Sequence, residues 1–118
     1  MDVIINGTKY RIVKKKYDED DAFDRSGIDG YCNRWQKLIV YCDMSTYPDW
    51  QHEPEETVKL CEKHTLRHEI VHAFLNESGL SDSSLVSGNG WATNEEMVDW
   101  IASRGPLIYK AWREAGAL

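Results

Sequence analysis

Residues 54–79 read PEETVKLCEKHTLRHEIVHAFLNESG and predict the longest helix of the chain. Pro54 suits the first turn of a helix, because the backbone N–H that proline lacks has no partner there. Gly79 suits the position just after the last turn, where the chain often adopts a left-handed conformation. A broad apolar stripe lies between them, formed by Leu66, Ile70, Ala73 and Phe74 and widened by Val71 and Leu75. We therefore expect a central, largely buried helix from about Glu55 to Ser78.

The second half of this helix contains His68-Glu69-Ile70-Val71-His72, which has the pattern H-E-x-x-H. Residues four apart share a helix face, so the two imidazoles can bind one metal ion. Glu69 lies beside them, where its carboxylate can take a proton from a zinc-activated water. His64 continues the row, but it lies about 12 Å from His72 along the helix axis and cannot ligate the same ion. We expect Zn²⁺ bound by His68 and His72, with Glu69 as the general base.

The third ligand is expected on a later helix, which runs from about Thr93 to just before Gly105. Thr93 and Glu96 have the spacing of a capping box, which turns Glu96 back towards the helix start and leaves Glu95 free. Asp99 follows Glu95 by one turn, where a carboxylate can accept a hydrogen bond from a ligand histidine and fix its tautomer. We expect Glu95 as the third ligand and Asp99 as the outer partner, with Glu96 as the reserve ligand. The alternative is an acidic helix face exposed to solvent.

The rest of the sequence predicts an α+β fold. The first half alternates apolar runs with turn residues, which indicates strands at 3–5, 10–14, 31–33 and 38–42, the last two as a hairpin. Loops are expected at 17–29, 43–53 and 79–90, and a last helix at about 107–114. We expect a small twisted β-sheet of three or four strands packed on the central HExxH helix, with one or two further C-terminal helices. The strand at 38–42 is nearly all apolar and is expected to be buried on both faces.

Length and composition indicate a single domain, 1–118, in the cytoplasm. The chain has 14 Lys and Arg against 20 Asp and Glu, a net charge of -6, which argues against binding to nucleic-acid backbones. No apolar run approaches the length that spans a bilayer, so no membrane partner is expected. Three cysteines are an odd and sparse set, which is typical of free thiols in a reducing compartment: Cys32, Cys42 and Cys61. We expect a monomer.

With these residues in place, the chain resembles the zincin metallopeptidases, and within them the gluzincins. That pattern combines HExxH on one helix with a glutamate ligand on a following helix, and thermolysin-like enzymes carry N-E-x-x-x-D there. Asn94-Glu95-Glu96-Met97-Val98-Asp99 matches it. The chain is also similar to the short ImmA/IrrE-type metallopeptidases of phages and mobile elements, which place a small β-sheet before the HExxH helix. The resemblance covers about residues 30–103.

This resemblance implies a zinc-dependent peptidase that acts on a peptide or protein substrate. Zinc would polarise the scissile carbonyl, Glu69 would activate the water, and the strand Leu38–Cys42 would pair with an extended substrate. An oxyanion-stabilising side chain is also expected, but the sequence selects none of the candidates: Tyr109, Arg67, His52 and Arg104. One alternative is a zincin-fold phage or mobile-element protein whose metal site has a non-peptidase or binding role. Another is that the HExxH pattern arises by chance in an unrelated α+β domain.

Overall fold

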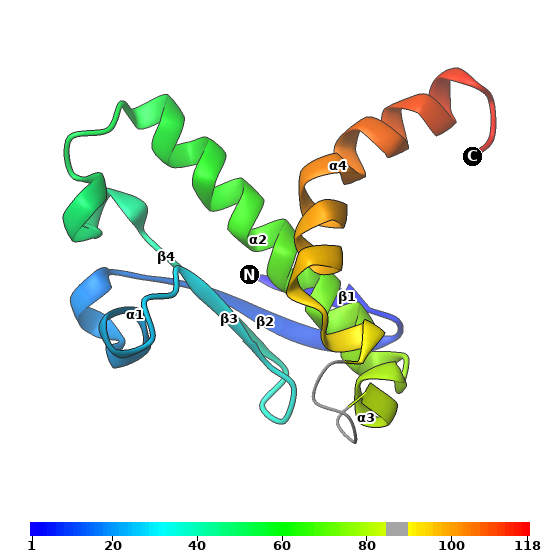
Figure 1. The fold of residues 1–118 in the computed structure, drawn as a ribbon, viewed down its shortest axis with the longest axis horizontal. Helices are drawn as coiled ribbons and strands as arrows, with labels where there is room; N and C mark the ends of the chain where they lie inside the picture. Colours follow the sequence, from blue (N-terminus) through cyan, green and yellow to red (C-terminus); the bar gives the residue numbers. More distant parts are fainter. Residues whose placement is uncertain (85–89) are drawn as a thin grey trace.

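The computed structural model describes residues 1–84 and 90–118, and it confirms the expected α+β fold. Four strands form one sheet in the order β1-β2-β4-β3 (Figure 1). Their bounds are Asp2–Ile5 for β1, Thr8–Lys15 for β2, Gly30–Asn33 for β3 and Leu38–Cys42 for β4. β1–β2 and β3–β4 pair antiparallel, whereas β2 and β4 pair parallel. The predicted hairpin is therefore correct, and β1 and β3 are the two edges of the sheet.

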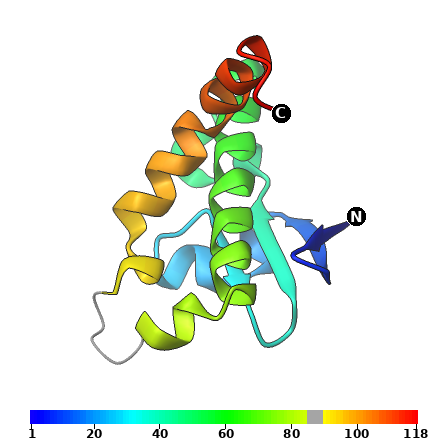
Figure 2. The ribbon, with the colours of Figure 1, turned by 90° about the vertical axis from the view of Figure 1, so that its right-hand side faces the viewer.

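Two long helices build the other layer of the molecule. α2 (Glu55–Glu77) ends as predicted, with Gly79 in the left-handed region at a φ of 82°. α4 (Glu95–Glu114) packs mainly against α2 rather than against the sheet. Figures 1 and 2 show α2 lying over one face of the sheet, while the outer half of α4 projects away from the body. Neither these helices nor the shorter ones in the described part of the chain have the length and apolar character needed to cross a bilayer.

The expected loops contain short helical segments, so those predictions were too simple. In the loop at 17–29, Asp20 caps α1 (Asp21–Arg25) by accepting a hydrogen bond from the Ala22 N–H. In the loop at 43–53, Asp43 accepts from the Ser45 N–H in the same way. Short polar side chains stabilise such turns because they satisfy free backbone donors. The remaining segments are η1 (Tyr17–Glu19), η2 (Met44–Thr46), η3 (Pro48–Trp50), α3 (Leu80–Ser84) and η4 (Trp91–Thr93). Part of the predicted loop at 79–90 lies outside the described residues.

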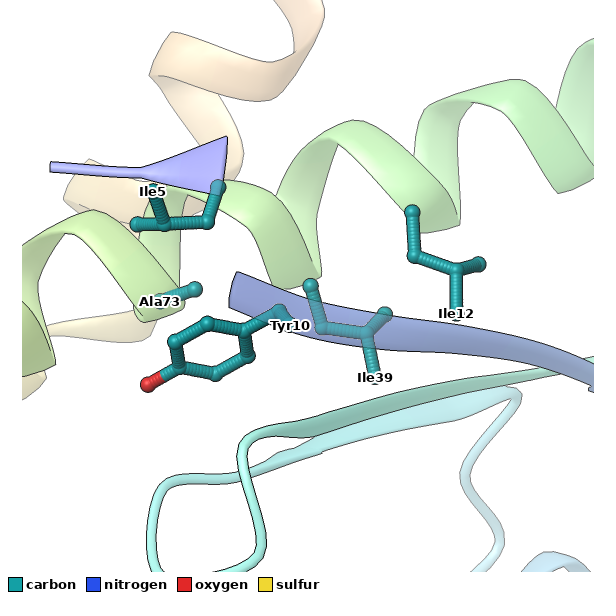
Figure 3. Packing of buried hydrophobic residues seen from close by; sticks show 5 residues of the cluster. All are labelled: Ile5, Tyr10, Ile12, Ile39 and Ala73. Atoms are coloured by element: carbon teal, nitrogen blue, oxygen red, sulfur yellow. The ribbon is translucent and has the colours of Figure 1, made fainter. Parts of the chain in front are cut away.

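The main core fills the space between the sheet and α2 (Figure 3). Its fully buried members are Ile5, Tyr10, Ile39 and Ala73, and Ile12 is almost as buried. β4 is buried on both faces, as predicted: Ile39 belongs to this cluster, while Val40 packs with Phe23 of α1 in a second one. The predicted stripe of α2 is partly wrong. Phe74 is half-exposed, and the buried face of the helix includes Glu62, Thr65 and Glu69 instead.

α4 is one continuous helix, which corrects the prediction of two helices divided at Gly105-Pro106. Pro106 lies inside the helix and has no N–H to donate to the carbonyl of Ala102. Arg67 of α2 supplies the missing donor, with its Nε 2.7 Å from the Ala102 oxygen. A side chain from the neighbouring helix thus satisfies the backbone group that the proline leaves unpaired. That exchange allows the helix to continue and fastens it to α2.

Candidate metal centre

Three side chains, two from α2 and one from α4, place potential ligand atoms within 4.8 Å of one another: His68, His72 and Glu95. His68 Nε2 lies 3.1 Å from His72 Nε2 and 2.9 Å from Glu95 Oε2, and His72 Nε2 lies 3.2 Å from that oxygen. Zinc bonds of about 2.0–2.1 Å in a tetrahedral site would place neighbouring ligand atoms about 3.3 Å apart. The three atoms therefore have the spacing of one face of a zinc tetrahedron, and this donor set fits the metal.

Asp99 orients one of the two histidines. Its Oδ1 lies 3.2 Å from His68 Nδ1 and 2.8 Å from His64 Nε2, and these contacts, His64 first, lower the pKa of Asp99. A carboxylate only accepts hydrogen bonds, so these partners assign the proton of His68 to Nδ1 and leave Nε2 with a free lone pair. Burial lowers the pKa of His72, which favours the neutral ring that a metal needs. His64 is not among the three converging residues.

The start of α4 places Glu95, and it does so differently from the sequence prediction. The N-cap is Asn94, whose side chain accepts a hydrogen bond from the Met97 N–H at 2.8 Å. Thr93 belongs to the short turn before the helix, so the predicted Thr93–Glu96 capping box is wrong. Asparagine is the better N-cap of the two neighbouring candidates, which accounts for the shift by one residue. Glu95 joins the cluster as the first residue of α4, whereas Glu96 is exposed and lies outside it.

Glu69 lies beside the cluster and is only 6% exposed. Gly30 of β3 makes this close packing possible, because a Cβ there would lie 2.6 Å from Thr65 Cγ2 and 3.5 Å from Glu69 Cγ. Burial, with the negative charges of Glu95 and Asp29 nearby, raises the pKa of Glu69 to about 8. A cation held by the cluster would oppose this shift, since positive charge favours the carboxylate. Glu69 is thus placed to accept a proton next to the site.

A groove of about 690 Å³ is lined by the three candidate ligands together with Glu69 and Asp99. α2 forms its base, the first two turns of α4 form one wall, and β3 with the loop before it forms the other. The expectation that Leu38–Cys42 pairs with a substrate is wrong, because this strand is β4 and both its neighbours in the sheet are already present. The free edge beside the groove is β3. Its wall residues Asp29, Cys32 and Arg34 were missed in the sequence, since the edge position depends on the long-range pairing of β2 with β4.

The four oxyanion candidates lie elsewhere. None of these four candidates is among the described residues that line the groove. Arg67 is engaged with the Ala102 carbonyl, and Tyr109 is 53% exposed on the outer half of α4. His52 and Arg104 are exposed as well. The geometry thus supplies a ligand set, a buried carboxylate and a groove, but it gives none of these four a role in them.

Comparisons of the chain with protein-family models, with curated proteins and with solved structures find no match. The protein is therefore classified by its architecture rather than by a family. It is a small α+β domain in which two helices bring two histidines and a glutamate together beside a free sheet edge.

Proposed function

We propose that the protein is a gluzincin-like zinc peptidase that hydrolyses a peptide bond. The observation that carries this proposal is the convergence of His68, His72 and Glu95 with the tetrahedral spacing of zinc ligands, next to the buried carboxylate of Glu69. A purely structural zinc site has four protein ligands and needs no free carboxylate beside them. Three ligands and an adjacent acid are the composition of a hydrolytic site.

His68, His72 and Glu95 would hold the zinc ion, which when bound would lower the pKa of a water and polarise the substrate carbonyl. Glu69 takes the proton of the attacking water and then delivers it to the nitrogen of the departing amine. Burial favours the protonated form of Glu69, so this side chain can hold the proton between the two transfers. Asp99 holds His68 in the tautomer that directs Nε2 to the cluster.

The edge of β3 would hold the substrate in place of the strand first expected to do so. The Asp29 carbonyl accepts a hydrogen bond from the Cys42 N–H at 2.8 Å. Because inward and outward backbone groups alternate along an antiparallel strand, the N–H and C=O groups of Gly30 and Cys32 point away from β4. An extended peptide can add to this edge as a further strand. Gly30 packs close to Glu69, so such a peptide would pass directly over the catalytic group.

Two adjacent glutamates provide a matched test of the metal site. We expect about one zinc per chain in the wild type and in Glu96→Gln, and loss of that zinc in Glu95→Gln, measured by elemental analysis after dialysis. Zinc that stays bound in Glu95→Gln would contradict the ligand set.

A second experiment tests the chemistry separately. The zinc-loaded wild type is expected to cleave members of a mixed peptide library, detected by mass spectrometry, and Glu69→Gln is expected to bind zinc but lose at least about a hundredfold in rate. Zinc binding without any cleavage would favour the alternative of a metal site with a binding role. Cleavage that survives Glu69→Gln would refute the assignment of the base.

A further inference from the structure

The groove has opposite charges at its two ends. What we infer from this arrangement rests on the peptidase function proposed above. β3 follows α2 in the same sense: Thr65 Oγ1 donates to Asp29 Oδ2 at 2.9 Å near one end, and Asn76 Nδ2 contacts Cys32 Sγ at 3.6 Å near the other. The groove is lined by α2 residues from His64 to Asn76, which span about 18 Å along the helix. An extended chain rises about 3.3 Å per residue, so this length suits about five substrate residues.

The wall charges are almost all negative. Four carboxylates line the groove, one from α2, one from the loop before β3 and two from α4: Glu69, Asp29, Glu95 and Asp99. Among the described lining residues, Arg34 is the only lysine or arginine. It follows β3 in the turn to β4, beyond Cys32, so its charge lies at the Asn76 end. A carboxylate on the substrate therefore finds a favourable partner at this end, and away from the proposed zinc position it meets repulsion along the rest of the groove.

Within the described part of the chain, the guanidinium of Arg34 has one ring contact and one ion pair, which leaves donors for a further partner. Its Cζ lies 4.6 Å from the centre of the Trp35 ring, and its Nη1 donates to Asp82 Oδ1 at 2.7 Å. Asn33 fixes the turn, because its Oδ1 accepts from the N–H groups of Trp35 and Gln36. Asp82 is 69% exposed, so this ion pair is screened by water and contributes little. Arginine carries five donors, and the planar fork suits a second carboxylate.

We infer that the groove binds an extended segment of about five residues with an acidic side chain at the Arg34 end. Arg34 is then the residue that determines specificity, and Asp82 is the internal competitor for its donors. Substitutions of the two residues should consequently act in opposite directions. Loss of Arg34 removes the preference for an acidic residue, and loss of the Asp82 charge strengthens it.

The test measures binding rather than turnover. Fluorescein-labelled heptapeptides carry a single glutamate at each position in turn, or glutamine at the same position, in an otherwise uncharged sequence. Their affinities are measured by anisotropy with zinc-loaded Glu69→Gln protein, to which the other substitutions are added. We expect glutamate at one position to bind about five- to tenfold more tightly than glutamine. Arg34→Gln should abolish this ratio, Asp82→Asn should increase it, and Arg25→Gln, whose exposed side chain does not line the groove, should leave it unchanged.

Each outcome decides the inference. Three results would overturn it: an affinity ratio of glutamate to glutamine near one at every position, a ratio that survives Arg34→Gln, or no binding of any peptide. A ratio that depends on Arg34 supports it even if the wild type cleaves none of these peptides, and in that case the peptidase function fails alone. Cleavage of the peptides by the wild type without any glutamate preference has the opposite meaning: the peptidase function stands and the acidic specificity fails.

Discussion

At the scale of single residues, the unusual feature is the buried carboxylate of Glu69. Burial of this side chain, which is 6% exposed, raises its pKa from an ordinary value of 4.5 to about 8, and the nearby charges of Glu95 and Asp29 add to the shift. In the unfolded chain the same group is ionised above about pH 4.5. Folding therefore costs free energy at neutral pH, because the buried carboxyl keeps a proton that the unfolded chain has released. A cation bound beside Glu69 would reduce this cost.

This cost predicts a pH-dependent effect of Glu69→Gln. Between about pH 4.5 and 8 the folded state retains a proton that the unfolded state has released, so the stability of the metal-free wild type falls as the pH rises. Glutamine is neutral throughout. We expect the melting temperature of Glu69→Gln in EDTA to exceed that of the wild type by several degrees at pH 8, with the gain nearly absent at pH 4. The exposed Glu96→Gln is the control, and parallel curves for wild type and Glu69→Gln would contradict the prediction.

Site residues could be predicted from the sequence where local contacts place them, and could not where contacts between distant parts of the chain do. His68, Glu69 and His72 share one helix, so their spacing alone shows which face they occupy. Glu95 was selected by an argument about the helix start that was wrong in detail, since Asn94 rather than Thr93 is the cap. Arg34 could not be found in this way, because its position beside the site depends on strand order.

At the scale of secondary structure elements, the contact between Arg67 and Ala102 determines how α4 is held. Ala102 is 1% exposed, and its carbonyl would lack a donor if neither Arg67 nor residue 106 supplied one. Glu95 and Asp99 belong to the half of α4 that precedes this contact. The sequence rule that proline ends a helix failed here because the compensating donor comes from 35 residues earlier in the chain. A rule based on local sequence cannot detect such a partner.

The contact predicts a coupling between two substitutions that share one carbonyl. Arg67→Met keeps an apolar stem but removes the donor, and we expect it to lower the free energy of unfolding by about 1–2 kcal/mol. In a Pro106→Ala background the new backbone N–H can pair with Ala102, so the same substitution should cost about 1 kcal/mol less. Urea denaturation of the four proteins of this cycle, all without metal, measures the coupling. Strictly additive effects would show that Arg67 acts elsewhere.

At the scale of the whole molecule, the candidate centre joins two parts that are otherwise held differently. α2 is fixed to the sheet along its length: Glu62 binds Lys14 and the Met44 N–H, and Glu77 binds Lys37 and the Tyr10 hydroxyl. α4 packs mainly on α2, and its outer half exposes Leu107, Tyr109 and Trp112. The sequence predicted the strands and the hairpin of β3 with β4. It did not show the parallel pairing of β2 with β4, because that contact joins segments without a local turn.

A metal ion bound by both helices should therefore stabilise one half of α4 and not the other. Hydrogen exchange followed by mass spectrometry, with and without zinc, measures this directly. We expect zinc to slow amide exchange at 98–104 by at least about tenfold, because a ligand that binds only the closed arrangement reduces its opening in proportion to saturation. The amides at 107–114 have no site residue near them and should exchange quickly in both states. The amides of β2 should exchange equally slowly with and without zinc. Zinc protection that extends evenly to 107–114 would mean that the whole helix docks on metal binding, and unchanged exchange at 98–104 would show that α4 does not supply a ligand.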